Sequence, residues 1–259
     1  MGSEALLAWG AVSPSDDRPP SAGVRAGAVV LAALGGFVLG ELVATALIAL
    51  GAGVAHYPGG LDALAHASAP PWWVNALSLI GLWTGFAAAI VVATRYAGLV
   101  ALAHQWRLRG SDVLYVGLGV VVQLAVDLAY APFHLHTFNQ PVTHLFGGAR
   151  GPSFVLLGLL TVVGAPFMEE WFFRGVLFRG LAAATAGAGR WGLAGAVVAS
   201  ALLFALAHGE PLQFAGLAAL GVVLAVLVVR TRRLTPSIIT HMSFNAVAFV
   251  ALAAQRGGH

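Results

Sequence analysis

The sequence predicts an all-α, polytopic membrane protein with about seven transmembrane helices and a polar cavity inside the membrane. Composition is the first reason: 59% of the 259 residues are hydrophobic and only 9% are charged, whereas about 25% of residues are charged in soluble domains. The second reason is that apolar segments long enough to cross a bilayer, about 20 residues each, recur along the whole chain. The third is the placement of the arginines between these segments.

Each predicted span is an apolar segment bounded by polar or charged residues. The seven segments cover residues 25–50, 73–101, 112–131, 153–178, 191–208, 212–230 and 236–254. Arginines gather in alternating connections, with Arg18 and Arg25, Arg107 and Arg109, Arg179 and Arg190, and finally Arg230, Arg232 and Arg233. By the positive-inside rule these connections face the cytoplasm, which predicts a cell-membrane protein with a cytoplasmic N-terminus.

The chain is predicted to hold one transmembrane domain after a short tail. Residues 1–22 contain an apolar stretch that is too short to span, followed by a run rich in Ser, Asp and Pro, and we interpret them as a disordered cytoplasmic tail. Residues 23–259 form the transmembrane domain, with a motif-bearing core at 150–255. Membrane lipid is therefore an expected partner, and nucleic acid is not.

The most informative segment is Glu169-Glu170-Trp171-Phe172-Phe173-Arg174, because it places three charges in an apolar span. Ionisable groups at membrane depth cost several kcal/mol and usually persist where they are paired and functional. Glu170 and Arg174 are four residues apart and are predicted to pair on one helix face. Glu169 points about 100° away and is predicted to lack a partner on its own helix. It could handle a proton, bind a metal or pair with another helix.

Two further polar pairs follow in later spans. Phe204 precedes His208 by four residues, and His241 precedes Asn245 by four, so each pair shares a helix face. Polar side chains are disfavoured against lipid, so we expect those from the three spans to converge on one cavity. Three serines in these spans are interpreted as helix-packing residues: Ser200, Ser237 and Ser243.

The residue types limit the chemistry of such a cavity. A carboxylate beside a histidine can hold and deprotonate a water molecule, and a histidine with an asparagine can donate hydrogen bonds to a developing oxyanion. These functions together outline amide hydrolysis. Glu169, His208 and His241 are also a set of ligands suited to zinc or another divalent metal, although the usual H-E-x-x-H motif is missing.

The three motifs resemble those of a known family. Glu-Glu-x-x-x-Arg at 169–174, Phe-x-x-x-His at 204–208 and His-x-x-x-Asn at 241–245 occur in this order on successive hydrophobic segments. This pattern resembles the CPBP family, the CAAX-protease and bacteriocin-processing intramembrane proteins, also called the Abi family. The resemblance covers about residues 150–250.

The resemblance implies a glutamate-dependent intramembrane endopeptidase that acts on a membrane-associated or lipidated peptide. Glu169 and His208 would activate the water, and His241 and Asn245 would stabilise the oxyanion. Glu170, Arg174 and Phe204 would support the site. The resemblance leaves two mechanisms open. The protein could be a metalloprotease that uses zinc, or it could use a water molecule that is held by glutamate without a metal. Better-known members have one more span after the last motif, so a membrane-protein partner is a further expectation.

The span order creates a geometric problem for this grouping. His208 is expected near the outer end of its span and His241 near the cytoplasmic start of another, about 20 Å or more apart by helix rise. They can meet if the Gly209-Glu210-Pro211 turn is buried in the protein, or if His241 lies deep in the bilayer. We predict a buried turn, with Glu210 at the rim of the cavity.

Two other functions are compatible with the same residues. One is a non-catalytic membrane scaffold, such as a bacteriocin-immunity or interaction protein. The other is a proton-coupled transporter, which is disfavoured because the first three spans do not repeat in the last four. A hydrolase requires Glu169, His208, His241 and Asn245 around one pocket, whereas a transporter requires a polar path across the bilayer.

Overall fold

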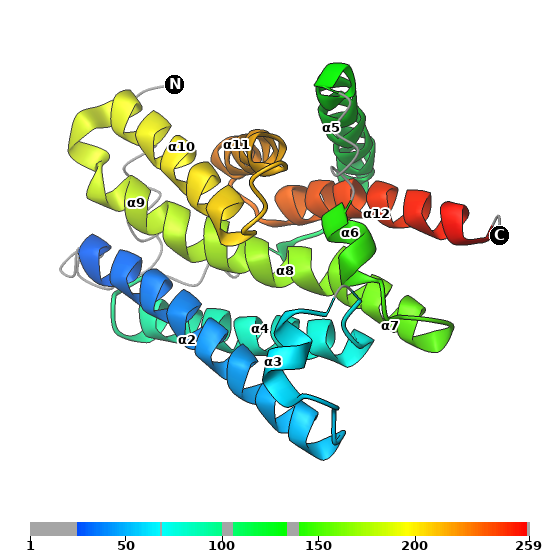
Figure 1. Cartoon of the computed structure of the whole chain (residues 1–259). Helices are drawn as coiled ribbons and strands as arrows, with labels where there is room; N and C mark the ends of the chain where they lie inside the picture. The colour runs from blue at the N-terminus through cyan, green and yellow to red at the C-terminus, as the bar shows by residue number, and fades with distance from the viewer. Residues whose placement is uncertain (1–24, 68, 100–105, 134–139, 258–259) are drawn as a thin grey trace. The chain divides into compact units, whose positions relative to one another are not determined.

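A computed structural model describes residues 25–67, 69–99, 106–133 and 140–257 (Figure 1). The predicted tail at residues 1–22 lies outside the described residues. Within them every regular element is a helix, and the only β-type contact is an isolated bridge between Pro71 and Gly148. The all-α prediction is confirmed.

Seven helical segments in the described ranges are long and apolar enough to cross a membrane. Their bounds are Ala26–Val54, Trp72–Arg95, Gly110–Phe133, Pro152–Ala184, Ala186–Ala207, Phe214–Thr231 and Thr235–Arg256. The predicted number of spans is confirmed, and the protein is a multi-pass membrane protein. Its orientation in the membrane stays a prediction.

Two span ends differ from the prediction. The second span ends at Arg95 instead of residue 101, because Gly98 adopts a φ of 74° and the Ala97 N–H turns back to the Val92 carbonyl, at 3.3 Å. Such a left-handed glycine is a common way to end a helix. The fourth span continues to Ala184, so Arg179 lies on a helix and is buried instead of standing in a connection.

The chain divides into two compact units. The first comprises Met1–Phe37, Phe86–Leu108 and Glu169–Ser237, and the second Val38–Gly85, Arg109–Met168 and Ile238–His259. The helices of the first unit are parts of α2 (Ala26–Val54) and α4 (Trp72–Arg95), then η5 (Glu170–Phe178), α9 (Arg179–Ala184), η6 (Ala186–Ala188), α10 (Gly189–Ala207) and α11 (Phe214–Thr231).

The core of the first unit is aromatic and depends on one close helix approach. Phe86 stacks on Phe172 with ring centroids 3.9 Å apart, and both are buried. Helices α10 and α11 lie against each other at Gly221, where a Cβ atom would stand only 2.9 Å from the Ala201 Cα. Small residues at this contact let two apolar helices pack backbone to backbone, as is common in membranes.

The second unit contains the remaining elements. They are the rest of α2 and α4, α3 (Gly60–Ala65), η2 (Gly110–Val113), α5 (Leu114–Tyr130), η3 (Ala131–Phe133), α6 (Gln140–Leu145), α7 (Pro152–Leu159), η4 (Leu160–Gly164), most of α8 (Ala165–Glu169) and most of α12 (Thr235–Gly257).

Close glycine contacts also join helices of the second unit. Helices α2 and α4 lie side by side (Figure 1), and a Cβ on Gly81 would stand 2.3 Å from the Ala44 backbone. Helix α5 meets α12 in the same way, since a Cβ on Gly119 would stand 2.2 Å from the Thr240 carbonyl oxygen. The Ser243 hydroxyl also donates to the Val116 carbonyl of α5, at 2.6 Å.

Candidate functional site

The predicted pair of Glu170 and Arg174 is confirmed in the first unit. The Arg174 Nη1 donates to Glu170 Oε1 at 2.8 Å, and both side chains are fully buried. They lie on η5, a π-helical stretch of nine residues. Such segments are rare and occur frequently at functional sites.

Arg174 also holds the surrounding helices in place. Its Nη2 donates to the Gly221 carbonyl of α11 at 3.1 Å. Its guanidinium lies 4.4 Å above the Phe204 ring of α10 and 5.9 Å from the Phe173 ring. A desolvated cation over an aromatic face is stabilised by about 2 kcal/mol. One buried arginine therefore joins η5, α10 and α11.

Ser237 belongs to this network, and the sequence analysis missed it. Its hydroxyl donates a short hydrogen bond to Glu170 Oε2, and Ser237 is fully buried. Both oxygens of Glu170 are thus engaged, one by Arg174 and one by Ser237. The interpretation of Ser237 as a packing residue was wrong. The available signal was its position four residues before His241, on the same face of the last span.

Ser237→Ala is expected to lower the free energy of unfolding by about 1–3 kcal/mol, because a buried carboxylate oxygen loses its donor. Ser200→Ala is the matched control. Ser200 is also fully buried, but its hydroxyl has no hydrogen-bond partner among the described residues, so its removal should be neutral or stabilising. Thermal unfolding of the purified proteins in detergent measures both. Equal effects of the two substitutions would show that Ser237 does not hold Glu170.

Gly221→Ala is expected to destabilise the first unit by about 1–3 kcal/mol, because the new Cβ would press on the Ala201 backbone and displace the carbonyl that Arg174 binds. Gly195→Ala, on α10, is the control, since a Cβ there meets nothing within 4 Å. That change should stabilise the helix by about 0.5–1 kcal/mol. Thermal unfolding temperatures that move in the same direction for both variants would contradict the expectation.

Glu169 precedes this pair and lies half-buried at the start of the first unit's η5 segment. It is less isolated than predicted, because its charge also acts on Arg174. Glu170 already accepts hydrogen bonds at both oxygens. Of the two adjacent carboxylates, Glu170 is therefore fixed by its partners, and a role of Glu169 in the chemistry stays a prediction.

His208 caps the end of α10 and is held there by its own helix. Its Nδ1 lies 2.8 Å from the Phe204 carbonyl oxygen, and its ring packs edge-on against the Phe204 ring at 4.6 Å. A carbonyl oxygen can only accept, so Nδ1 must carry the proton. In the neutral ring this leaves the Nε2 lone pair as the basic atom.

The turn after His208 differs from the prediction. Gly209 and Pro211 are exposed and Glu210 is half-buried, so the prediction of a buried turn was wrong. Hydrogen bonds within the turn explain why its backbone groups do not need partners from the rest of the protein. The Gly209 N–H bonds the Leu206 carbonyl at 3.0 Å and the Gln213 N–H bonds the Glu210 carbonyl at 3.0 Å, so the turn satisfies these groups by itself.

The third motif lies in the second unit, on α12. His241 is buried, and as the seventh residue of α12 it lies about 9 Å along the helix from its start. Asn245 is half-buried, and its Nδ2 donates to the Thr161 carbonyl at 3.0 Å. Thr161 belongs to the π-helical segment η4. Asn245 keeps a second N–H for another acceptor.

The predicted site residues therefore come from both units. Glu169, His208 and the supporting residues Glu170, Arg174 and Phe204 lie in the first, while His241 and Asn245 lie in the second. Their convergence on one polar cavity stays a prediction.

The metal hypothesis depends on the same convergence. Across the described ranges, no three His, Asp or Glu side chains are grouped so that they could hold a metal ion. In the described part of the first unit, Glu170 is engaged by Arg174 and Ser237, which leaves Glu169, His208 and Glu210 as candidate ligands. The residues of that unit do not fit a metal by themselves, and a site completed by His241 stays a prediction.

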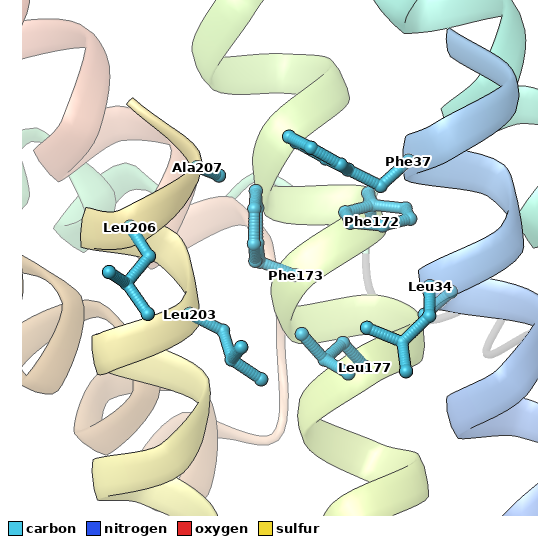
Figure 2. Close-up of a pocket in the computed structure, with 9 residues that line it drawn as sticks. Leu34, Phe37, Phe172, Phe173, Leu177, Leu203, Leu206 and Ala207 are labelled. Atoms are coloured by element: carbon cyan, nitrogen blue, oxygen red, sulfur yellow. The ribbon is translucent and has the colours of Figure 1, made fainter. Parts of the chain in front are cut away.

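An apolar groove opens in the first unit between α2, η5 and α10 (Figure 2). Its volume is about 190 Å³, and Leu34, Phe37, Phe172, Phe173, Leu177, Leu203, Leu206 and Ala207 point into it. Phe173 lines the groove and also packs edge-on against Phe204, at 5.3 Å. Ala207 is the residue before His208. The groove is therefore lined by residues of η5 and α10, the same helices that carry Arg174 and His208.

Comparison with known proteins gives one finding. Residues 151–247 match the family model described as "Type II CAAX prenyl endopeptidase Rce1-like". No curated protein and no solved structure matches the chain. The matched range contains all three motifs, from Glu169 to Asn245, and the resemblance to the CAAX-protease and Abi family is confirmed. Residues 151–247 of this multi-pass membrane protein therefore form an Rce1-like domain of that family.

Proposed function

We propose that this protein is an intramembrane endopeptidase that hydrolyses a peptide bond of a membrane-associated or lipidated substrate. The observation that carries the proposal is the Rce1-like match, because it includes Glu169, His208, His241 and Asn245 in one range of the chain. The buried pair beside Glu169 supports it. The buried ion pair and the hydrogen bond from Ser237 fix the helix turn on which Glu169 stands.

In the proposed reaction Glu169 removes a proton from a water molecule, which His208 helps to orient through Nε2. The resulting hydroxide adds to the carbonyl carbon of the peptide bond. His241 and the second N–H of Asn245 donate to the oxyanion that forms. The C–N bond then breaks as the proton passes from Glu169 to the leaving nitrogen. This sequence needs no metal, and it requires the two units to bring the four residues together.

The groove of the first unit is proposed to receive an apolar chain of the substrate. Its lining is made of Phe, Leu and Ala side chains, and α2 and α10 carry exposed leucines there, with Leu34 48% and Leu206 62% exposed. Each buried CH₂ group contributes about 0.8 kcal/mol. Because Ala207 lines the groove and His208 follows it, a chain in the groove would place the attached peptide beside the histidine.

The proposal is tested by comparing protein termini in membranes that contain the wild type or the Glu169→Gln variant. Glutamine keeps the shape of the side chain and removes the base. New termini that appear only with the wild type are the expected result, and they would identify the substrate. Adding a chelator to the wild type should leave these termini unchanged.

The Arg190→Gln variant serves as the control, since Arg190 is exposed and stacks on Trp191 at 5.2 Å. It should produce the same new termini as the wild type. Identical termini for wild type and Glu169→Gln, with both proteins folded, would overturn the endopeptidase proposal in favour of a non-catalytic scaffold.

A further inference from the structure

Two arginines of the second unit converge on one backbone carbonyl. The Arg150 Nη1 donates to the Ala149 carbonyl oxygen at 2.8 Å, and the Arg256 Nη1 donates to the same oxygen at 3.2 Å. The two nitrogens can therefore be no more than about 6 Å apart. Arg150 also donates to the Gly147 carbonyl at 2.9 Å, and the Arg256 Nη2 to the Phe146 carbonyl at 3.0 Å.

The loop that carries these carbonyls is fixed. Phe146 and Ala149 are buried, and Asn75 of α4 donates to the Leu145 carbonyl at 2.7 Å. Gly148 lies so close to the preceding segment that a Cβ there would stand 2.2 Å from the Pro70 carbonyl oxygen. A rigid loop holds both guanidinium groups in place, so they are positioned together before any ligand arrives.

The charge of this pair is uncompensated within the described part of the chain. Neither guanidinium forms an ion pair with a carboxylate there. Their contacts are the backbone carbonyls and the Phe154 ring, which lies 5.1 Å from Arg256. Each guanidinium carries five N–H donors, and these bonds use only some of them. Two neighbouring like charges with unused donors have the chemistry that recognition of an anion requires.

The position of the pair in the fold indicates which anion is available. Arg150 precedes α7 by two residues, and Arg256 lies in the last turn of α12. Both helices belong to membrane-spanning segments. The ends of such segments are expected at the bilayer surface, where the phosphate groups of phospholipids lie.

Apolar side chains continue from the pair along α7. The Phe154 ring contacts Arg256 and stacks on Phe249 of α12, with centroids 5.1 Å apart. Val155 and Leu159 follow on one face of α7 and are 57% and 58% exposed. A lipid whose phosphate binds the arginines could lay its acyl chains along this face, which free phosphate cannot do.

We propose that Arg150 and Arg256 bind the phosphate group of an anionic phospholipid, with its acyl chains against α7. The site does not depend on the proposed peptidase activity, since neither arginine is among the residues assigned to the chemistry. Guanidinium groups suit it because they can donate two parallel hydrogen bonds to a phosphate. A net negative headgroup is favoured over a zwitterionic one, because a choline cation would face two positive charges.

The test uses the full-length protein, purified in detergent and stripped of lipid. Its thermal unfolding can be followed by the fluorescence of its seven tryptophans. The probes are phosphatidylglycerol, phosphatidylcholine and inorganic phosphate, each titrated separately. We expect phosphatidylglycerol to raise the unfolding temperature at a concentration about tenfold below that needed of phosphatidylcholine. Inorganic phosphate should give no comparable rise.

Arg150→Gln is the decisive variant, because Arg150 is exposed and its replacement should not unfold the protein. It should raise the half-saturating concentration of phosphatidylglycerol about tenfold, as expected for the loss of one charge-assisted hydrogen bond. Arg256→Lys should have a smaller effect, since it keeps the charge. Arg190→Gln, which removes an exposed arginine elsewhere, should leave the titration unchanged.

Three results would overturn the assignment. Equal phosphatidylglycerol affinities for wild type and Arg150→Gln would show that the pair is not the site. Equal responses to phosphatidylglycerol and phosphatidylcholine would remove the preference for an anionic lipid. A full rise in unfolding temperature with inorganic phosphate alone would assign the site to free phosphate.

Discussion

Arg174→Ala is expected to lower the free energy of unfolding by about 3–5 kcal/mol, which is the usual effect of removing one partner of a buried ion pair. The Glu170 carboxylate would remain fully buried with its neutralising cation gone. The same change also removes the hydrogen bond to the Gly221 carbonyl and the cation above the Phe204 ring. Three helices of the first unit would lose their common contact.

Denaturant or thermal unfolding in detergent measures this effect, with Arg190→Ala as the exposed control, expected to stay within about 0.5 kcal/mol of the wild type. The double variant Glu170→Met/Arg174→Met separates charge from packing. Because it leaves no buried charge, it should be more stable than either single methionine variant. Single effects that simply add in the double variant would show that the two side chains do not interact.

Glu169→Gln and Glu170→Gln are expected to affect different properties although the residues are adjacent: the first the rate of cleavage, the second the stability of the fold. Glu169→Gln should lower kcat by about 10²–10⁴-fold, the range for loss of a general base, and leave the unfolding temperature close to that of the wild type. Glu170→Gln should instead destabilise the protein by about 3 kcal/mol, because Arg174 would be buried without its counter-charge.

Two quantities are measured for each variant. One is the rate at which it cleaves a substrate identified by the comparison of protein termini in membranes, and the other is its unfolding temperature. Rates are compared at a temperature where both variants are folded. A large loss of stability in Glu169→Gln with a normal rate would assign Glu169 to the structure and not to the reaction. Normal stability in Glu170→Gln would contradict the buried pair.

The spans were predictable because each is a local property of the sequence. Length and apolar composition decide whether a segment can cross a bilayer, and neither depends on distant contacts. The ends were less predictable. Arg179 looked like a connecting residue, but the helix continues through it and buries it. Gly98 ends the second span early through a single backbone angle.

The contacts of the candidate site also differ in how far they could be predicted from the sequence. The Glu170–Arg174 pair follows from a spacing of four residues on one helix, so it could be predicted. The bond from Ser237 to Glu170 joins residues 67 apart, and the bond from Arg174 to Gly221 joins residues 47 apart. No local pattern encodes such contacts. The exposed turn after His208 was missed because its backbone bonds are also invisible in the sequence.

The buried network around Arg174 has a consequence for biosynthesis. On the scale measured for insertion by the translocon, each charged residue at the centre of a helix costs about 2.5–3.5 kcal/mol. The segment Pro152–Ala184 carries Glu169, Glu170 and Arg174, and the groups that complete their hydrogen bonds, Gly221 and Ser237, are synthesised later. We therefore expect the nascent span to stay beside the insertion machinery until α11 and the start of α12 have emerged. A chain interrupted before Ser237 would leave this span incompletely bonded and open to quality-control proteolysis.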